Sequence, residues 1–423
     1  MTARAASRAA AAAAPARPRA NAKRARATTP RVQPHARAIP QGRLEQRVLG
    51  FVTLGLVAFG LVMVFSATST PAALANSDPM TFLTKQAIYA FGGIVLLAVL
   101  SRIDYHRLRR LTPMFLVGAF GLCAAVLVIA PPINGARRWF IVGPVSVQPS
   151  ELAKLALCLW VCARLSRRPV PKTMSELMKP IGFVCAAFCA LIILQPDLGT
   201  TIALVLMVAG VLVVSGVPSR LLVLSGTLTL ALGGAAIWYQ PYRRARFFSF
   251  LNASQDPQGT GYQITQAKIG LASGGYTGLG LGHGVTKSGY LPEAHTDMIL
   301  AIIGEELGLI GLTLLVAAFV LFAWAGFRVA LACRDPFGKR LAAGITTLVC
   351  GQAVINIAAV LGVAPLTGIP LPFVSYGGSS LIVLLAAVGI LLNIAVNGRV
   401  VEARVRDRSR GNSRARPARA RSR

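Results

Sequence analysis

Long apolar runs are the feature that most constrains how this chain can fold. Stretches such as 51–66 (FVTLGLVAFGLVMVFS), 199–215 and 378–396 carry almost no charge. A helix needs roughly 20 such residues to cross a bilayer core of about 30 Å. In lipid only helices or closed barrels satisfy all backbone groups, and these runs lack period-two alternation. We expect spans near 48–66, 87–103, 113–131, 151–165, 181–195, 199–215, 221–239, 298–325, 341–363 and 376–396.

Composition supports this fold class. Of the 423 residues 54% are hydrophobic and only 14% are charged, whereas a soluble domain carries about 25% charged residues. The sequence therefore predicts an all-α polytopic membrane protein with ten transmembrane helices, the membrane domain being 48–398. A long outer loop, 240–297, joins the seventh and eighth helices.

The two ends of the chain concentrate its net charge of +30. Residues 1–47 are rich in Ala, Pro and Arg, and residues 399–423 have Arg at nearly every second position. Neither segment can bury a core, so both are predicted to be disordered tails. Nucleic-acid binding is one interpretation. We favour a topological one, in which Arg beside the spans holds both termini in the cytoplasm and contacts anionic membrane lipids.

The distribution of Lys and Arg predicts the side of each loop. With the N-terminus inside, the basic segments 101–110, 163–172, 215–220 and 327–340 all lie inside. The outer segments are then 67–86, 132–150, 196–198, 240–297 and 364–375. One basic cluster, Arg243, Arg244 and Arg246, falls outside against this rule. An anionic ligand would explain it.

None of the seven cysteines lies in a predicted outer segment. Cys158 and Cys162, and likewise Cys185 and Cys189, share i,i+4 spacing, but neither His nor a carboxylate lies within one helical turn of them. We therefore expect small packing residues rather than disulfides or metal ligands.

Charged residues lie near the ends of two predicted outer segments, and their presence there has alternative explanations. Glu151 and Lys154 are three apart, so they share one helix face just inside the membrane boundary. They either neutralise each other or line a polar cavity, since intramembrane ions usually mark a site. Asp197, in the tight turn QPDLGTT, is a candidate helix cap.

Glycine dominates the outer segment 256–297. A short amphipathic piece around 262–272, which contains Lys268, precedes GLGLG. The glycines could cradle phosphate, but no lysine-serine signature follows them. A re-entrant or interfacial loop explains them better. The Pro/Gly segment 367–380 leads through Ser375 into the last span. Earlier in the chain, the segment 134–160 has short β-prone pieces followed by a predicted helix start at Pro149.

The stretch YLPEAHTDMILAIIGEELG places carboxylates at, and in, the eighth span. Asp297 precedes an apolar run and could be a helix cap. Glu305 and Glu306 lie deeper, on faces about 100° apart. At most one of them can face the same cavity as Asp297, so their expected role is structural. His295 is expected to be a neighbour that tunes Asp297, since no second His lies at metal-ligand spacing.

Seven motifs together resemble the SEDS family of shape, elongation, division and sporulation proteins. They are QPSELAKL, QPDLGT, RRARFFSFLN, GYQITQAKIGLASGG, GLGLG, YLPEAHTDMILAIIGEELG and PLPFVSYGGSS, and the resemblance covers roughly residues 45–400. GLGLG and PFVSYGGSS look more like the division member than the elongation member. Departures are modest: Ala-Ser in LNASQDPQG replaces a proline-led stretch, and HTDM replaces an HTDF-like form.

The resemblance implies a peptidoglycan glycosyltransferase of the bacterial plasma membrane, active at the septum. Its substrate would be lipid II, and its partners a class B penicillin-binding transpeptidase and other divisome proteins. Asp297 matches the family's HTD aspartate and is the implied catalytic base. Candidate substrate-binding residues are Arg243, Arg244, Arg246, Glu151, Lys154, Asp197, Lys268, His295 and Ser375. No cofactor or metal site is implied, although assistance by a divalent cation stays open.

Two other functions remain compatible with the sequence. Ten spans with intramembrane charges also suit a lipid II transporter, although the two halves show no convincing repeat. A division scaffold that recruits partners through the Arg-rich tails would not need the outer acidic and basic residues.

Overall fold

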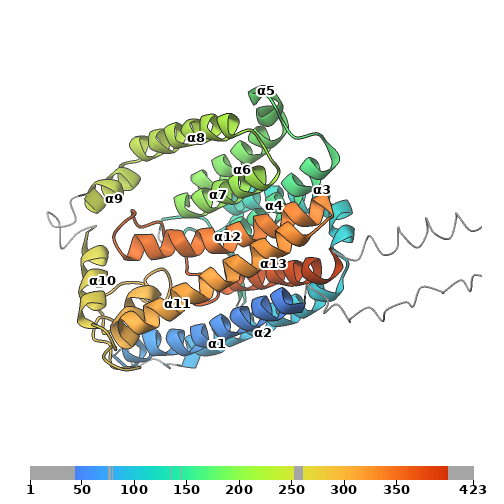
Figure 1. Ribbon diagram of the computed structural model, residues 1–423. Coiled ribbons are helices and arrows are strands. Elements are labelled where there is room, and N and C mark those ends of the chain that lie inside the picture. The colour runs from blue at the N-terminus through green and yellow to red at the C-terminus, as the bar shows by residue number, and fades with distance from the viewer. Residues whose placement is uncertain are drawn as a thin grey trace, which may run out of the picture. The chain divides into compact units, whose positions relative to one another are not determined.

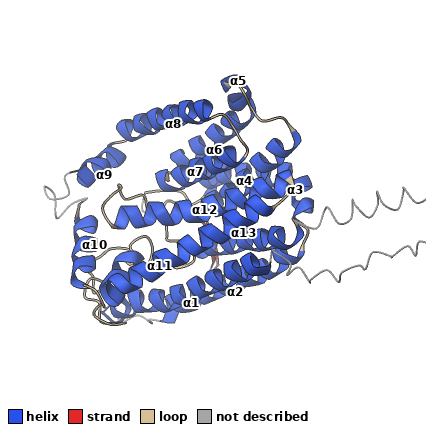
Figure 2. Cartoon of the chain, viewed as in Figure 1, coloured by secondary structure: helices blue, strands red, loops and turns tan. Residues whose placement is uncertain are grey.

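The computed structural model describes residues 43–74, 78, 80–133, 135–143, 145–251 and 261–398. These residues are almost entirely helical (Figures 1 and 2). The helices are α1 (Arg43–Leu74), α2 (Met80–Arg102), α3 (Tyr105–Ile129), α4 (Pro149–Arg167), α5 (Met174–Leu177), the π-helical turn η1 (Met178–Gly182), α6 (Phe183–Leu194), α7 (Leu198–Val214), α8 (Ser219–Tyr239), α9 (Pro241–Leu251), α10 (Tyr262–Ser273), α11 (Ile299–Ala332), α12 (Pro336–Val360) and α13 (Gly378–Asn397). The predicted tails lie outside the described residues, apart from 43–47.

Within the described ranges, eight helical segments are long and apolar enough to cross a membrane. They are α1, α2, α3, the continuous run α5–η1–α6, α8, α11, α12 and α13. The remaining two predicted spans correspond to α7, which has only 17 residues, and to α4. Helix α4 includes Glu151, Lys154, Arg164 and Arg167. The helical class is confirmed, and the count of ten spans stays a prediction.

Several helix boundaries differ from the expected ones. Helix α2 begins at Met80 rather than near 87, α3 begins at Tyr105 rather than near 113, and α11 ends at Ala332 rather than near 325. Helix α1 begins at Arg43, about one turn before the expected boundary. Polar contacts explain this early start, because Glu45 is buried and its Oε1 lies 3.5 Å from Nε of Arg328 on α11. At its other end α1 continues to Leu74, beyond the apolar run that marked the span.

The segment before α4 forms a small β-hairpin; the sequence predicted its β-prone pieces but not their pairing. Strands β1 (Phe140–Val142) and β2 (Val145–Val147) pair antiparallel, with Phe140 opposite Val147. Helix α4 then begins at Pro149, the predicted start. Proline suits this first helical position because its missing N–H needs no partner there.

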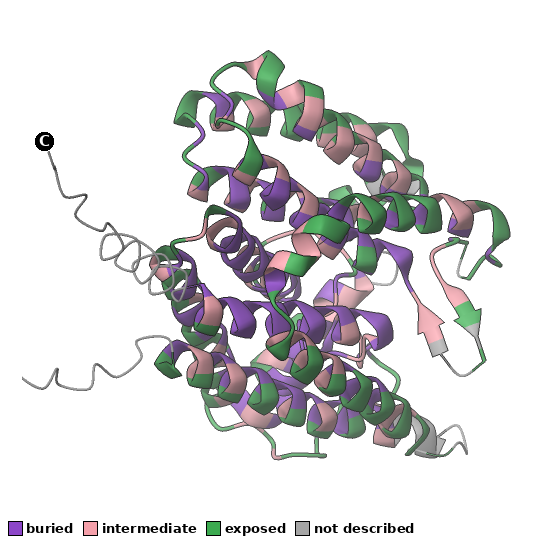
Figure 3. Ribbon diagram, turned by 90° about the vertical axis from the view of Figure 1, so that its right-hand side faces the viewer, coloured by how far each residue is buried: buried purple, intermediate pink, exposed green. Residues whose placement is uncertain are grey.

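Helix α13 is largely buried inside the bundle, and most residues of α12 and α4 are buried as well. Figure 3 shows buried residues along the inner faces of the helices and exposed ones on the outer faces. Helix α13 packs on α2, α12 packs between α11 and α7, and α3 packs on α4. Helix α8 is the opposite case, since only Leu221 of its residues is buried. An apolar helix with so little protein contact is stable only in a surrounding that is itself apolar.

The seven cysteines are all free thiols, and four of them are buried: Cys123, Cys158, Cys162 and Cys333. All seven lie in or against the apolar core, as expected of packing residues.

Helix α11 is interrupted at Gly308, whose φ of 62° and ψ of −161° are not helical. The loop after α10 fills this interruption. Leu279 N and Gly280 N donate to the carbonyls of Glu305 and Glu306, both at 3.0 Å. On the other side, Leu309 N and Ile310 N donate to Gly275 O and Tyr276 O at 3.0 and 3.2 Å. The backbone groups freed by the break are therefore satisfied by the loop.

Close approach explains two glycines of this loop. A Cβ on Gly274 would collide with the carbonyl of Gly304, and a Cβ on Gly278 would collide with that of Glu306. The GLGLG segment thus packs on α11 through Gly278, Leu279 and Gly280, and its expected re-entrant or interfacial placement beside the membrane stays a prediction.

Candidate active site

The 364–377 segment, which joins α12 to α13, connects several helix ends at the end of the bundle where α11 begins. Asn356 Nδ2 of α12 donates to Ile369 O at 2.8 Å, and Gln86 Nε2 of α2 donates to Ser375 O at 3.2 Å. A Cβ on Gly199, at the start of α7, would lie 2.6 Å from Thr367 O. Helices α2, α7 and α12 therefore all hold this segment.

Asp297 is half-buried beside the 364–377 segment. Its backbone carbonyl accepts a hydrogen bond from Asn356 Nδ2 at 2.7 Å. Its Oδ1 accepts from Thr296 Oγ1 at 3.2 Å, and its Oδ2 would lie 4.0 Å from a Cβ on Gly368. Because Asn356 holds the backbone carbonyls of both Asp297 and Ile369, the main chain at Asp297 has a fixed position relative to α12 and to the segment.

The helix-cap alternative for Asp297 does not match the start of α11. The N-cap residue is Met298, and no side-chain hydrogen bond caps the helix there. Asp197 behaves differently: it is the N-cap of α7, and its Oδ1 accepts from Thr200 N at 3.0 Å. The predicted capping role of Asp197 is confirmed, and the carboxylate of Asp297 has a different local role.

A second polar group surrounds Asp197. Its Oδ2 accepts from Gln148 Nε2 at 3.0 Å, and Gln148 N donates to Ser379 Oγ of α13 at 3.0 Å. Arg138 donates from Nε to Gln195 O and from Nη2 to Pro196 O, both at 2.6 Å. These bonds hold the segment that contains the hairpin against the QPD turn. Gly199, just after that turn, lies close to the carbonyl of Thr367.

Glu151 and Lys154 form a buried ion pair on α4, with 2.8 Å between Oε1 and Nζ. The side chains are only 3% and 1% exposed, so the self-neutralising interpretation holds for the pair as it stands. The second carboxylate oxygen, Oε2, is buried and has no hydrogen-bond partner within the described residues. An unpaired acceptor of this kind is costly unless it serves another group.

Glu305 and Glu306 both bind the loop that precedes α11, which confirms their expected structural role. Glu305 accepts from Val285 N at 2.8 Å and from the backbone and hydroxyl of Thr286. Glu306 Oε1 lies 2.6 Å from Lys287 Nζ, and both side chains are at most 1% exposed. Ser66 of α1 completes the group by donating to Glu306 at 2.7 Å.

His295 lies in an aromatic group rather than in a metal site. Its ring centroid is 4.9 Å from that of Phe82 and 5.6 Å from that of Tyr376, and its carbonyl accepts from Tyr376 N. Burial lowers the pKa of His295, although the charge of Glu293 opposes this shift. The neutral imidazole is therefore favoured near pH 7. In the described part of the chain, no cluster of three or more His, Cys, Asp or Glu residues could hold a metal ion.

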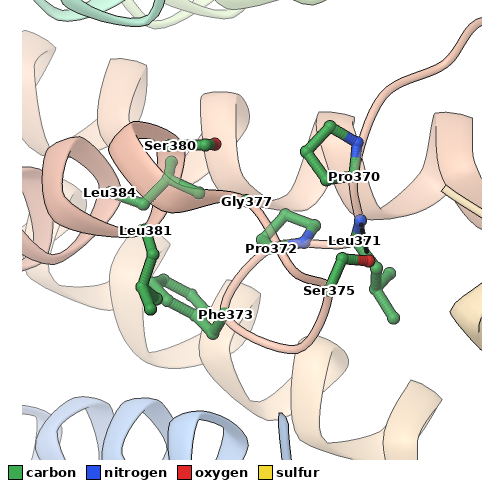
Figure 4. Close-up of a pocket in the computed structure, with 9 residues that line it drawn as sticks. All are labelled: Pro370, Leu371, Pro372, Phe373, Ser375, Gly377, Ser380, Leu381 and Leu384. Carbon is green, nitrogen blue, oxygen red and sulfur yellow. Dashed lines mark hydrogen bonds between the residues drawn. The ribbon is translucent and has the colours of Figure 1, made fainter. Parts of the chain in front are cut away.

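Ser375 and Lys268, two predicted binding residues, lie in different surroundings. Ser375 is buried, and its Oγ accepts from Leu371 N at 2.8 Å within the turn drawn in Figure 4. The hollow in that view has a volume of about 10 Å³, room for no more than about one water molecule. Lys268 is exposed on α10, and its Nζ would lie 2.9 Å from a Cβ on Gly362 at the end of α12.

The predicted arginine cluster lies on α9, which packs on α8. Arg244 is exposed, with its guanidinium 5.8 Å from the ring centre of Trp238. The side chains of Arg243 and Arg246 lie outside the described residues. Contact between this cluster and Asp297 therefore stays a prediction.

Lys287, Arg138 and Asn356 carry much of this geometry and were not singled out by the sequence. Asn356 had a local signal, since it is a polar residue inside an apolar span. Lys287 and Arg138 lie in loops, where a single basic residue is ordinarily solvated. The residues that Lys287 and Arg138 contact are distant in the sequence and become their neighbours only in the folded chain.

These observations define an integral membrane protein of the helical class, with a half-buried carboxylate held at one end of its bundle. Residues 46–400 match the family described as "Cell cycle protein", the FtsW, RodA and SpoVE family. The chain belongs to this family, the SEDS proteins, and is FtsW-like within it.

Relatives and solved structures agree with this assignment. A probable peptidoglycan glycosyltransferase FtsW of Geobacter sulfurreducens is 40% identical over 351 residues, covering 82% of this chain and 94% of that protein. Stage V sporulation protein E of Bacillus subtilis is 39% identical over 360 residues, covering 82% and 96%.

Among solved structures, RodA of Thermus thermophilus has a TM-score of 0.62 at 29% identity, covering 83% of this chain and 96% of that chain. A chain from "Structural coordination of polymerization and crosslinking by a peptidoglycan synthase complex" has a TM-score of 0.71 at 31% identity, covering 83% and 97%.

Proposed function

We propose that this chain is a peptidoglycan glycosyltransferase that polymerises lipid II into glycan strands during cell division. The observation that carries the proposal is the placement of Asp297. Its side chain is half-buried and does not occupy the cap position of α11, and its backbone carbonyl is bonded to Asn356 of α12, which also holds the 364–377 segment. A carboxylate held in this way is suited to general-base chemistry.

Chain growth requires a sugar hydroxyl of one lipid-linked unit to attack the anomeric carbon of another. The new C–O bond forms while the bond from that carbon to the diphosphate oxygen breaks. Asp297 accepts the proton of the attacking hydroxyl, and the diphosphate leaves with the electron pair. A direct displacement of this kind inverts the anomeric centre, and no covalent enzyme intermediate is needed.

The diphosphate leaving group needs cations at the same end of the bundle. Arg243, Arg244 and Arg246 are the proposed donors, because guanidinium groups bind phosphate oxygens in a forked geometry. Lys154, Glu151, Asp197, Lys268, His295 and Ser375 are proposed to line the same region. For Asp197 and Ser375 the hydrogen bonds given above support a positioning role in it.

The proposal includes an orientation of the chain in the membrane. Ten spans, with both termini inside and 240–297 outside, put Asp297 at the outer lip of the eighth span. A polyprenyl-linked substrate has its lipid in the bilayer and its sugars at that surface. The division septum is the proposed location, and a class B penicillin-binding transpeptidase the proposed partner. Likeness to a chain of a peptidoglycan synthase complex supports the partnership.

The proposal is tested by incubating the purified protein with lipid II, with and without the transpeptidase, and separating the products on a gel. We expect glycan strands in reactions that contain this chain. A parallel assay measures movement of labelled lipid II across the bilayer of reconstituted vesicles. Movement without any polymer, in the presence of the partner, would reject the enzyme and favour the transporter.

A further inference from the structure

A basic hollow lies at the opposite end of the bundle from Asp297. Helix α12 relates the two sites: Asn356, which holds Asp297, is near its end, and Asp335 caps its start. At 1.5 Å per residue these two positions are about 30 Å apart. The hollow has a volume of about 450 Å³ and is lined by Asp104, His106, Arg107, Arg109, Arg110 and Arg167. This size is within the roughly 300–1,000 Å³ of small-molecule sites.

Four arginines in one hollow are electrostatically unfavourable without an anion. Arg107, Arg109 and Arg110 are in the first two turns of α3, where the backbone dipole is already positive and disfavours cations. Arg167 ends α4 and donates to Arg109 O at 3.4 Å, which brings the two helix ends together. Within the described residues, no ion pair joins any of the four guanidinium groups to a carboxylate.

The hollow also contains an unsatisfied donor. Arg109 Nε is buried and has no hydrogen-bond partner among the described residues. The single lining carboxylate, Asp104, is already engaged, because its Oδ1 lies 2.7 Å from His106 Nδ1 and accepts from His106 N. It is therefore a poor partner for the arginines.

The floor of the hollow is rigid. His106 Nε2 lies 3.5 Å from Asp335 Oδ2, and the His106 ring contacts buried Tyr105 in a tilted arrangement with 4.1 Å between centroids. Tyr105 in turn stacks on Phe337 of α12. The starts of α3 and α12 are thus locked together beneath the arginines, so little rearrangement is needed to bind a ligand.

We propose that this hollow binds the phosphate group of an anionic phospholipid headgroup. Forked guanidinium donors recognise phosphate oxygens, and basic pockets between transmembrane helices are suited to lipid headgroups. The hollow lies at helix ends, where a headgroup can reach it while its acyl chains stay beside the apolar helices. The proposal goes beyond general attraction of basic loops to the membrane, because it assigns one bound lipid to specific side chains. It does not depend on the glycosyltransferase proposal.

The test compares two variants that remove the same charge. Arg109→Gln/Arg167→Gln alters the hollow, whereas Arg168→Gln/Arg220→Gln alters two exposed arginines that do not line it. Each full-length protein is delipidated, titrated with phosphatidylglycerol or phosphatidylcholine, and examined by native mass spectrometry. We expect the wild type and the control to retain phosphatidylglycerol in preference to phosphatidylcholine. The hollow variant should bind phosphatidylglycerol about tenfold more weakly than the control.

Three outcomes would overturn the proposal. Equal loss in both double variants would show diffuse charge attraction, and equal retention of the two lipids would exclude headgroup recognition. Sodium phosphate alone displacing the lipid at equimolar concentration would assign the site to free phosphate. If the Gln variant does not fold, Arg109→Lys/Arg167→Lys replaces it. That variant keeps the charge but loses the forked donors, and is likewise expected to bind phosphatidylglycerol more weakly than wild type.

Discussion

Lys287 and Glu306 form an ion pair with 2.6 Å between Nζ and Oε1, in a part of the bundle where neither side chain is more than 1% exposed. The pair joins the loop before α11 to the helix itself, just ahead of the break at Gly308. Ser66 adds α1, since its hydroxyl lies within hydrogen-bond distance of both Lys287 and Glu306. The loop that ends in Asp297 is therefore fastened at a buried, charged point.

Removing Lys287 alone should be severely destabilising. Lys287→Met leaves a buried carboxylate without its cation, at a cost of about 3–5 kcal/mol. The double variant Lys287→Met/Glu306→Gln removes both charges and should recover a large part of that loss. Thermal unfolding of the purified proteins in detergent measures both effects. Equal unfolding temperatures for Lys287→Met and the wild type would show that the pair does not hold the loop.

The glycines of the loop give a matched comparison. Gly278 and Gly282 have similar positive φ values of 82° and 85°, so Ala is strained at both by about 1–2 kcal/mol. Only at Gly278 would the new Cβ also collide with α11, since nothing lies within 4 Å of a Cβ on Gly282. We expect Gly278→Ala to lower the unfolding temperature clearly more than Gly282→Ala. Identical effects would mean that the loop does not dock closely at the break.

Asn356 should matter for activity because it positions Asp297. Asn356→Leu leaves the carbonyls of Asp297 and Ile369 without this donor, at about 1–3 kcal/mol for each group that stays unpaired. Polymerisation should then fall by more than tenfold, with membrane insertion preserved. Gln352→Leu is the control, since Gln352 is equally buried about one turn earlier on α12. The positioning role would be refuted by equal polymerisation rates in the two variants.

The sequence predicts what depends on local pattern. Helices lie at all ten places where apolar runs predicted spans. The β-prone pieces of 134–160 correspond to strands β1 and β2, which are followed by a helix that starts at the predicted Pro149. The capping role of Asp197 was also predictable, because a cap and its helix are neighbours in sequence. The start of α1 was missed because residues 43–47 are mostly polar, and the partner of buried Glu45 is Arg328, far along the chain.

Long-range pairing could not be predicted from local pattern. Lys287 and Glu306 are 19 residues apart with a loop between them, and no periodicity relates such positions. The break at Gly308 was equally hidden, since a glycine inside an apolar run usually continues the helix at a small cost. Its partner is the backbone of residues 275–280, whose glycines indicated close packing but not the surface on which they pack.

The predicted orientation can be examined with single cysteines in a background without the seven native ones. Tyr290 and Lys172 are both exposed, and the charge distribution puts them on opposite sides. On intact cells an impermeant thiol reagent should label Tyr290→Cys and not Lys172→Cys. Permeabilised cells, in which both should react, provide the control. Labelling of position 172 alone would reverse the orientation.

The central claim is that the carboxylate of Asp297 acts as the base. Asp297→Asn keeps the shape of the side chain but removes the proton acceptor, and loss of general-base assistance costs about 10²–10⁴ in rate. Glu293→Gln removes the same charge from an exposed position in the same loop and should have little effect. Both variants should insert and bind the transpeptidase like the wild type.

The most direct measurement is the amount and length of glycan strand formed from lipid II by purified Asp297→Asn, with the transpeptidase partner in its wild-type form. The account predicts almost no polymer from this variant and near wild-type polymer from Glu293→Gln. Wild-type polymer from Asp297→Asn would contradict the assignment of Asp297 as the catalytic base.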